Sequence, residues 1–318
     1  MDLWLEDREK ISGRYNWFCR RASVTYTLQY WLGDGYSACQ FLSNTVMAIG
    51  SEMPPTAVLE LFTIPVLTDN TGPTPMTKIL SLGLPSVDDG WRVAQLNFYH
   101  PPIENILLRN NCLFSHTTGT DTQPFISTSS NDIVFATLGI GGSYGYDNIS
   151  FVVHSSALLQ LISIPSHEHI ENTIPWESWG PTVTRWHEYT VRGLKPFASG
   201  QRCILQPRTW PWMGSHSWEL WDFNPYRVRR LGENFTLESE KASLSVETEP
   251  SYARSHGIKK GVYSSLPFVK IIPKQCSDYH SMGVYNDRIS GTKVRTFYNS
   301  WIVFLLDEWC NSRLAASV

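Results

Sequence analysis

The amino-acid sequence predicts an all-β protein built from short antiparallel strands with few short helices, and three observations support this fold class. Several short segments alternate apolar and polar residues with a period of two. Those segments are rich in β-branched and aromatic residues, and glycine or proline separates many of them. Long stretches with a helical period are missing. We therefore expect a β-propeller-like arrangement of about six or seven irregular blades, with a large β-sandwich as the second choice.

Strand signals occur in eight segments and a helix signal in one. The strands are expected at residues 24–31, 58–64, 92–99, 132–138, 149–153, 217–223, 262–272 and 293–306. In 92–99 one parity is mostly apolar and the other more polar, which is typical of a half-buried antiparallel strand. The glycine-rich stretch 139–145 predicts a hairpin turn. Ser155 and Ser156 predict the cap of a short helix over 157–162.

The whole chain, residues 1–318, is expected to form a single propeller-like β domain. No fixed period of roughly 40 to 45 residues, the signature of standard WD repeats, is found, so the blades are expected to be irregular. Residues 68–75 are a loop rich in proline and threonine. The stretch 232–260 is polar and contains five glutamates, and it is therefore expected to be a disordered, mobile insertion.

Composition and charge narrow the functional classes. Only 17% of the residues are charged and the net charge is −3, so neither nucleic acid nor a membrane surface is expected as a partner. The acidic, mixed start lacks a secretory signal, and no apolar run reaches membrane-spanning length, so a cytoplasmic or nuclear protein is expected. The six cysteines lie far apart without zinc-finger spacing and are interpreted as reduced core thiols.

A search for catalytic motifs assigns none. Gly141-Gly142-Ser143-Tyr144-Gly145 has the letters of GxSxG but belongs to the glycine-rich turn 139–145, so no nucleophile elbow is assigned. The chain has no P-loop, and Tyr144 stands where a dinucleotide fingerprint would need glycine. Residues 167–171 offer four possible metal ligands, His167, Glu168, His169 and Glu171. Neighbouring residues alternate faces in a strand, so His167 and His169 would need a third ligand from elsewhere, and the stretch is interpreted as a solvated loop. Carboxylates such as Glu177 and Asp222 could supply the pair that glycoside cleavage needs, but the sequence does not fix the distance between them. We assign no catalytic residue, no metal and no cofactor, and expect the protein not to be an enzyme.

Two tryptophan-centred clusters stand out, at residues 175–186 and 222–230. Clustered tryptophan with proline and glycine predicts either a rigid corner of a β core or an exposed aromatic platform for a peptide or sugar, and the structural interpretation is favoured. In the functional interpretation Trp210, Trp212 and Trp218 would extend the platform, and the arginines would form a basic patch for an acidic partner. The candidate binding residues are Trp176, Trp179, Arg185, Trp186, Trp221, Asp222, Asn224, Arg227, Arg229 and Arg230.

The same clusters carry a resemblance to a protein family. The motifs are 174–181 with Thr184-Arg185-Trp186, then Gly200-Gln201-Arg202, then Asp222-Phe223-Asn224-Pro225 with Val228-Arg229-Arg230; weaker agreement lies at 37–42, 59–62 and 151–159. Together they resemble the C-terminal region of fungal, mainly basidiomycete, F-box-containing proteins. This resemblance implies a propeller-like β domain that captures a protein for ubiquitination.

The chain departs from that family near its N-terminus. Family members carry a short helical F-box that opens with a Leu-Pro pair and docks on the adaptor of a cullin-type ubiquitin ligase. Here Leu84-Pro85 and Leu266-Pro267 precede strand-like or loop sequence, so no F-box is recognised, and it is either truncated or lost. We expect a non-enzymatic protein-interaction domain resembling a ligase substrate receptor, with the adaptor as partner only where an F-box is restored. The alternative is an aromatic-rich carbohydrate-binding or glycoside-cleaving β protein.

Overall fold

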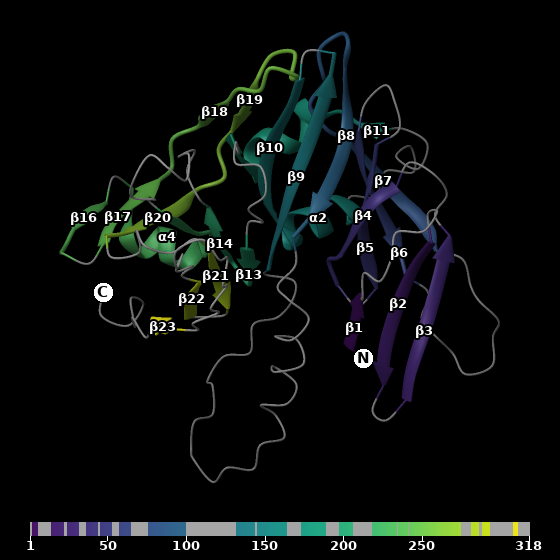
Figure 1. Ribbon diagram of the computed structural model, residues 1–318, viewed down its shortest axis with the longest axis horizontal. Coiled ribbons are helices and arrows are strands. Elements are labelled where there is room, and N and C mark those ends of the chain that lie inside the picture. The colour runs from purple at the N-terminus through teal and green to yellow at the C-terminus, as the bar shows by residue number, and fades with distance from the viewer. Residues whose placement is uncertain are drawn as a thin grey trace, which may run out of the picture.

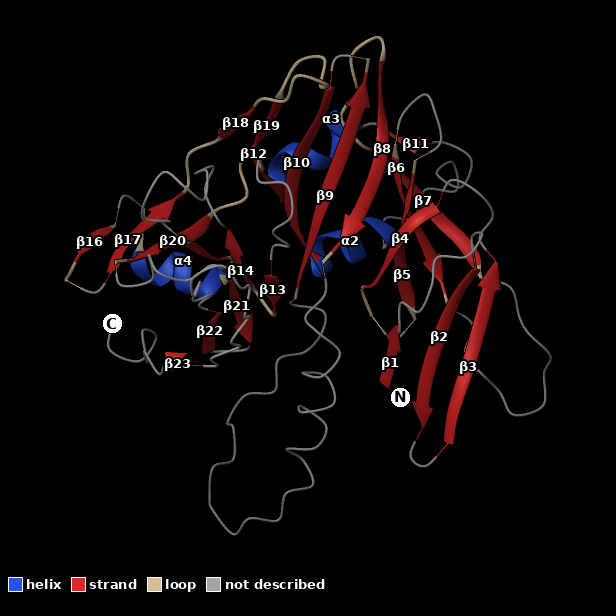
Figure 2. Ribbon diagram, viewed as in Figure 1, coloured by secondary structure: helices blue, strands red, loops and turns tan. Residues whose placement is uncertain are grey.

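The computed structural model shows a protein dominated by β-strands, with three short helices in the part that it describes (Figures 1 and 2). The described residues are 2–5, 14–21, 24–31, 36–43, 45–52, 57–64, 76–99, 132–143, 145–163, 173–188, 197–205, 218–233, 235–240, 242–274, 281–285, 288–292 and 308–310. The predicted all-β class is confirmed. Of the predicted strands, the one at 293–306 lies outside the described residues.

Two sheets form a sandwich at the centre of the described structure. The first has the order β11-β7-β6-β5-β4, with β4 (Tyr36–Phe41), β5 (Val46–Ser51), β6 (Val58–Thr63), β7 (Thr77–Gly83) and β11 (Thr173–Ile174). The second has the order β12-β10-β9-β8, with β8 (Trp91–Phe98), β9 (Ile133–Gly142), β10 (Gly145–His154) and β12 (Thr184–Glu188). Leu61 and Leu82 of the first sheet pack in one core with Leu138 and Phe151 of the second. These side chains are fully buried, so the sandwich encloses a dry apolar layer.

Strand β8 confirms the predicted strand at 92–99 and adds a β-bulge that the alternation did not reveal. Its pairing register with β9 shifts between Val93 and Gln95, so Ala94 is an extra residue on this strand. The shift moves the buried positions from odd to even residue numbers, and Val93 and Leu96 therefore face the same core. The carboxylate of Glu52 accepts the backbone N–H of Leu96 at 3.0 Å.

The hairpin predicted at 139–145 is confirmed, although the glycines extend the strands further than expected. β9 continues to Gly142, and β10 begins at Gly145 with φ +148°. Ten residues of each strand pair in register. Residues 133–140 of β9 are all buried because the four-stranded sheet is covered on both faces.

A six-stranded sheet covers the second face of β9 and β10, on the side away from β4–β7 (Figure 1). Its order is β13-β14-β15-β20-β17-β16, with β13 (Phe197–Ser199), β14 (Arg202–Leu205), β15 (Glu219–Asp222), β16 (Thr236–Glu238), β17 (Ala242–Glu247) and β20 (Phe268–Pro273). Trp221 and Phe268 pack on Phe135 and Val152 of the sandwich. Leu220 and Val269 point to the opposite face, which helix α4 (Pro225–Leu231) covers with Val228 and Leu231.

The stretch 232–260 is folded, which corrects the expectation of a disordered insertion. It supplies β16, β17 and β18 (Ser251–Ala253), and β17 pairs with β20 inside the six-stranded sheet. Ala242, Leu244 and Val246 are buried, while Ser243 and Ser245 between them are half-buried. The alternation is a strand signal, but small and polar residues at the outer positions made the segment look solvent-exposed.

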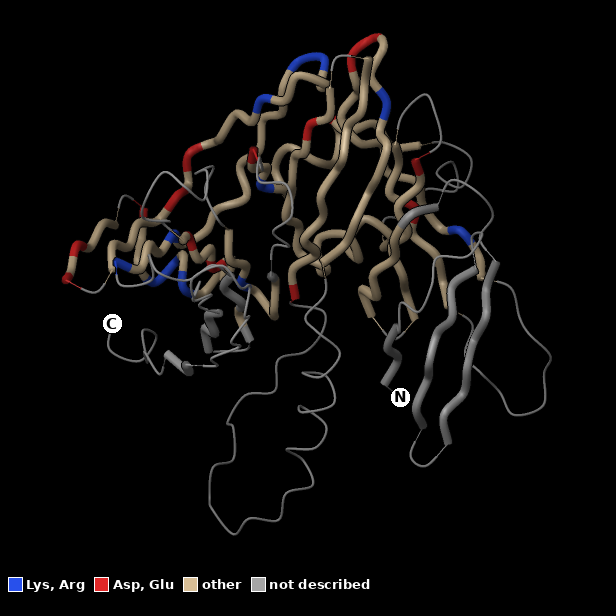
Figure 3. The backbone as a smooth tube through the Cα atoms, viewed as in Figure 1, with Lys and Arg blue, Asp and Glu red and all other residues tan. Residues whose placement is uncertain are grey.

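The predicted ring of six or seven blades is not confirmed. The described strands form six sheets, none of them closed, with two to six strands each. The remaining sheets are β1 (Asp2–Leu5) with β2 (Arg14–Arg21) and β3 (Val24–Trp31), then β18 with β19 (Val262–Ser264), and β21 (Ser281–Tyr285) with β22 (Arg288–Thr292) and β23 (Glu308–Cys310). Lysines, arginines and acidic residues are sparse on the sandwich strands and more frequent at their ends and on α4 (Figure 3).

The helix predicted over 157–162 is confirmed as α2 (Ser155–Ile162), but the predicted serine cap is wrong: Ser155 and Ser156 lie within the helix, and His154 occupies the N-cap position without a side-chain hydrogen bond. Helix α3 (Trp176–Val183) replaces the rigid turn expected there. Pro175 precedes it, Glu177 lies in its first turn, and Trp176 and Trp179 share its buried face. Pro181 lies inside the helix, so its missing N–H removes one bond of the i→i−4 ladder near the C-terminal end. No helix among the described residues is long and apolar enough to cross a membrane.

Replacing Gly180 with alanine is expected to destabilise the fold by about 1–3 kcal/mol, because the site is overpacked. A Cβ at Gly180 would lie 2.0 Å from a ring carbon of Trp176, whose side chain is held in the core. Urea denaturation followed by tryptophan fluorescence measures the loss. Gly141→Ala is the matched control, since its nearest contact would be 3.5 Å away; equal losses in the two variants would contradict the expected clash.

Candidate interaction site

The three tryptophans of the first cluster lie in the sandwich core. Trp176, Trp179 and Trp186 are 7%, 3% and 2% exposed. The ring centroid of Trp176 lies 5.1 Å from that of Trp179 and 5.3 Å from that of Trp186, both in edge-to-face geometry. Trp186 also stacks on Phe151 at 4.8 Å. These rings are structural, and they cannot form an exposed platform for a ligand.

Their N–H groups differ in hydrogen bonding. Nε1 of Trp179 donates to the carbonyl oxygen of Gly83 at 2.8 Å, which connects α3 to the end of β7. Nε1 of Trp186 is buried and has no hydrogen-bond partner among the described residues. A buried N–H without a partner costs stability, so packing must outweigh that cost at Trp186.

Arg185 is a buried cation held mainly by backbone oxygens. It is 3% exposed. Its Nη1 donates to the carbonyl oxygens of Glu249 and Ser264 and to Oγ of Ser251, at 2.9, 3.2 and 3.1 Å. The guanidinium lies 4.8 Å from the ring centroid of Phe268. Burial lowers the pKa of Arg185, and the charge of Glu247 opposes that shift. Arg185 therefore joins β12 to the segment around β18 and β19, and it is closed to a partner.

Asp222 is the centre of an ion-pair network at the end of β15. The carboxylate is 1% exposed, and its Oδ2 accepts from Nε of Arg202 and from Nη1 of Arg227, both at 3.0 Å. Its Oδ1 accepts the backbone N–H of Asn224 at 3.0 Å, a bond to the residue two positions on that is typical of an aspartate turn. Arg227 is therefore paired within the protein. Of the three arginines of α4, it is the one that cannot contribute to a basic patch for an acidic partner.

Asn224 begins helix α4. Its side-chain oxygen accepts the backbone N–H groups of Tyr226 at 2.9 Å and Arg227 at 3.3 Å, and Pro225 follows at the first helical position. This is a side-chain cap followed by a residue whose fixed φ suits a helix start. Asp222 and Asn224 together therefore set the position of α4, which covers one face of the six-stranded sheet.

Trp221 packs between the two layers and contacts a half-buried histidine. Its ring stacks on Phe268 at 4.2 Å and meets His187 edge-to-face at 5.0 Å. Nε1 of Trp221 donates to Glu219 at 2.8 Å. Trp218 is also buried, at 4% exposed, whereas Trp210 and Trp212 lie outside the described residues. The platform interpretation therefore fails for every candidate tryptophan that the structure describes.

The stability of the protein is expected to fall as the pH is lowered below about 6.5, with His187 as one cause. Burial lowers the pKa of His187 from the ordinary value of 6.5; Glu219 and Glu188 oppose the shift, and Lys270 adds to it. The unfolded chain therefore binds a proton at pH values where folded His187 does not, and protonation favours unfolding. Urea denaturation at pH 7.5, 6.5 and 5.5 should show a shallower pH dependence for His187→Gln. The exposed His256→Gln is the control and should leave the slope unchanged.

The exposed residues of the second cluster lie on α4. Arg229 and Arg230 are exposed, and neither forms an ion pair with a residue that the structure describes. Tyr226, on the first turn, is 77% exposed. Of the ten candidate binding residues, Arg229 and Arg230 are the ones that remain available to a partner, while Asn224 and Arg227 are half-buried and hydrogen-bonded within the protein.

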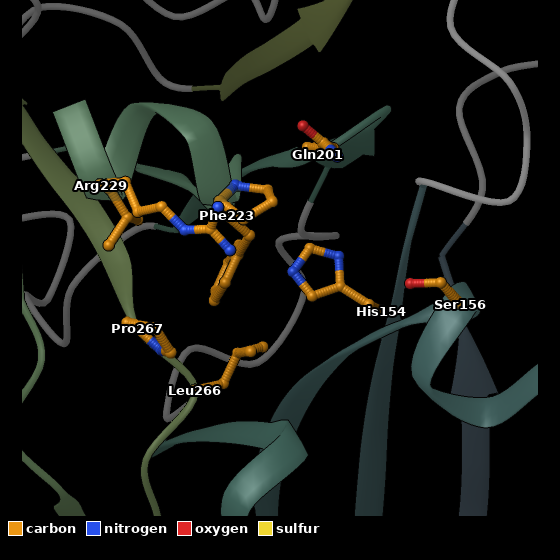
Figure 4. Close-up of a pocket in the computed structure, with 9 residues that line it drawn as sticks. His154, Ser156, Gln201, Phe223, Arg229, Leu266 and Pro267 are labelled. Carbon is orange, nitrogen blue, oxygen red and sulfur yellow. The ribbon is translucent and has the colours of Figure 1, made fainter. Parts of the chain in front are cut away.

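A pocket of about 310 Å³ lies beside α4, where the sandwich meets the six-stranded sheet (Figure 4). Its walls are formed by His154 at the end of β10, Ser156 on α2, Gln201 before β14, the β15–α4 junction and the segment before β20. The lining residues are His154, Ser156, Gln201, Phe223, Pro225, Val228, Arg229, Leu266 and Pro267. Arg229 is the candidate binding residue among them.

The other lining residues were not predicted as a site, although a signal for them was present. His154 and Ser156, Gln201, and Phe223 with Pro225 and Val228 all belong to the three motifs 151–159, 200–202 and 222–230. In the sequence these motifs indicated a family and its β domain, and no binding role was assigned to most of their residues. Nothing in the spacing showed that segments so far apart would share one pocket.

Metal binding and thiol chemistry add no site in the described part of the chain. His167, Glu168 and His169 lie outside it, and no group of three or more metal-ligating side chains occurs within it. Cys39 and Cys203 are buried thiols, as expected. Burial raises the pKa of Cys203 well above its ordinary value, and Asp222 and Glu219 add to the shift, so this thiol is unreactive in the fold.

Comparison with known proteins identifies no relative: no family model, no curated protein and no solved structure matches the chain.

Proposed function

We propose that this chain is a non-enzymatic protein-interaction domain that holds its partner at the pocket and at the exposed face of α4. The observation that carries the proposal is the convergence at one pocket of three motifs separated in sequence. Residues of 151–159, 200–202 and 222–230 supply every lining residue except Leu266 and Pro267. Beside the pocket, α4 exposes Tyr226 and Arg230, and tyrosine and arginine are the side chains that interfaces favour.

The kind of partner follows from the resemblance to fungal F-box proteins. A domain of that kind captures a protein for a ubiquitin ligase, and a propeller-like ring of irregular sheets is the architecture that the resemblance implies. The open sheets of the described residues would then be its blades. Contact with the cullin adaptor would require an F-box in addition to this domain.

The carbohydrate alternative receives less support from the pocket. Glycoside cleavage uses two carboxylates about 5–10 Å apart, and sugars stack on exposed aromatic rings. The lining of the pocket contains neither an acidic residue nor a tryptophan. The tryptophans that motivated the alternative are buried where the structure describes them.

The test is affinity purification of the tagged chain from its own cells, alongside two surface variants. Tyr226→Ala/Arg230→Ala changes the α4 face, and Tyr263→Ala changes an aromatic side chain that is 64% exposed on β19. We expect a protein that is retained by the wild type and by Tyr263→Ala, is lost from the α4 variant, and binds directly when purified. Retention of the same proteins by all three chains, with binding to an oligosaccharide array, would favour the carbohydrate alternative.

The ligase connection has its own experiment. The chain is mixed with the purified cullin adaptor, and so is a longer chain read from further upstream. Binding by the longer chain alone would show that the F-box is encoded upstream. Failure of both chains would leave an interaction domain without a ligase role.

A further inference from the structure

Hydrogen-bond donors from separate parts of the chain face the pocket. Figure 4 shows His154, Ser156 and Arg229 pointing toward the space between them, with Gln201 at its edge. Arg229 can only donate, and the imidazole, hydroxyl and amide groups of the other three can each donate one hydrogen bond or more. The remaining wall is apolar and consists of Phe223, Leu266, Pro225, Pro267 and Val228. Donors around the pocket, together with an apolar wall, favour a ligand with a charged end and an apolar body.

We propose that the pocket binds an anionic group, a carboxylate or a phosphate, carried on a short apolar or aromatic stem. Arg229 would pair with the anion in a bidentate way, because its planar guanidinium matches two oxygens of either group. Val228 and Pro267, which line the pocket and are half-buried, would contact the stem, with buried Phe223 behind them. A volume of about 310 Å³ suits a stem the size of one aromatic ring.

The local charges agree with an anionic ligand. Arg229 has no ion-pair partner among the described residues, whereas Arg227, two positions earlier, is neutralised by Asp222. Two acidic groups are close to the pocket in the fold without lining it. Asp222 is 1% exposed and shared by two arginines, and Asp132 lies beside Gly200. In addition, α2 begins at the pocket with no side-chain cap and no acidic residue in its first turn, so its positive end adds to the attraction.

The source of the anion rests on the proposed function: it would be a side chain or the C-terminal end of the captured protein. The affinity of the pocket for small anions does not depend on that function and is measured separately. If the chain binds small anions but retains no protein through α4, the proposed function is contradicted and the anion-binding inference stands. If a protein is retained through α4 but the pocket binds no small anion, the anion-binding inference alone is contradicted.

The experiment is titration calorimetry of the full chain with three ring-sized probes: benzoate, phenyl phosphate and neutral benzamide. At least one anion should bind about tenfold more tightly than benzamide, since a charge-assisted pair adds roughly 1.4 kcal/mol or more to the binding free energy. Tighter binding of phenyl phosphate identifies a phosphorylated side chain as the natural group, and tighter binding of benzoate identifies a carboxylate. Equal affinity for all three probes overturns the proposal.

Arg230 provides the matched control, because it is exposed on the same helix and does not line the pocket. Arg229→Met should weaken binding of the preferred anion by about tenfold, and Arg230→Met should change it by less than about twofold. Arg229→Lys keeps the charge without the planar guanidinium and should bind with intermediate affinity. All three variants alter exposed side chains, and circular dichroism checks that they are folded. Equal weakening by Arg229→Met and Arg230→Met would mean that general surface charge, and not the pocket, attracts the anion.

Discussion

Replacing Asp222 with alanine is expected to destabilise the protein by about 3–5 kcal/mol, the cost of removing one partner of a buried ion pair. The carboxylate is 1% exposed and accepts from Arg202 and Arg227, whose side chains are 22% and 20% exposed. Without it, two poorly solvated cations lose their shared counter-charge, and the N–H of Asn224 loses its acceptor. Urea denaturation followed by tryptophan fluorescence measures the loss.

Two further variants separate the effect of burial from that of charge. Glu238 pairs with Lys274 at 2.9 Å, but the two side chains are 63% and 46% exposed, so Glu238→Ala should cost less than about 1 kcal/mol. Asp222→Asn keeps the shape and one oxygen acceptor, and its cost should lie between the other two. If Asp222→Ala were no more costly than Glu238→Ala, Asp222 would not be the structural centre of this region.

The local signals in the sequence predicted the strands where alternation and burial agree. The strand at 92–99 and the glycine hairpin at 139–145 follow from patterns that a single sheet imposes. The bulge at Ala94 could not be predicted, because it depends on the partner strand. The folded segment 232–260 was missed because Ser243, Ser245 and Glu247 fill the outer positions of β17 and hide its apolar face. Whether the sheets stack or form a ring is decided by contacts between distant segments, which periodicity does not contain.

Helix α3 shows a conflict between local signals. Gly180 and Pro181 suggested a turn, while Pro175 and Glu177 are ordinary features of a helix start. The helix prevails because Trp176 and Trp179, three residues apart, reach the same core only in helical geometry. Gly180 has a packing role within it, since the ring of Trp176 occupies the space of a side chain.

The sequence shows local features of single residues in the candidate site, but it does not show that these residues come together. The acceptor role of Asp222 is a local property of the turn at Asn224-Pro225, whereas helix α4 and the capping role of Asn224 were not predicted. The pocket joins His154, Gln201, Phe223 and Leu266, and these residues meet only after the six-stranded sheet has packed on β9 and β10. Exposure is likewise a tertiary property: Arg185 and Arg229 look alike in sequence, yet one is buried and the other lines a pocket.

The structural role of the first tryptophan cluster predicts a loss of stability of about 3–5 kcal/mol for Trp186→Ala, as for other large aromatic side chains removed from a core. Trp186 is 2% exposed, stacks on Phe151 and meets Trp176 edge-to-face. The cavity left in the sandwich would lie between β10, β12 and α3. Thermal and urea denaturation measure the loss.

Two conservative variants then compare the indole N–H of Trp179, which is hydrogen-bonded, with that of Trp186, which has no described partner. Trp186→Phe removes an N–H without a described partner and keeps the stack on Phe151, so it should cost about 1–2 kcal/mol less than Trp186→Ala. Trp179→Phe breaks the hydrogen bond to Gly83 and leaves a carbonyl oxygen in a buried setting, so it should cost about 1 kcal/mol more than Trp186→Phe. A binding platform would give the opposite result, because its rings would be replaceable without loss of stability. Unchanged denaturation midpoints in these variants would therefore contradict a structural role and return the cluster to the candidate site.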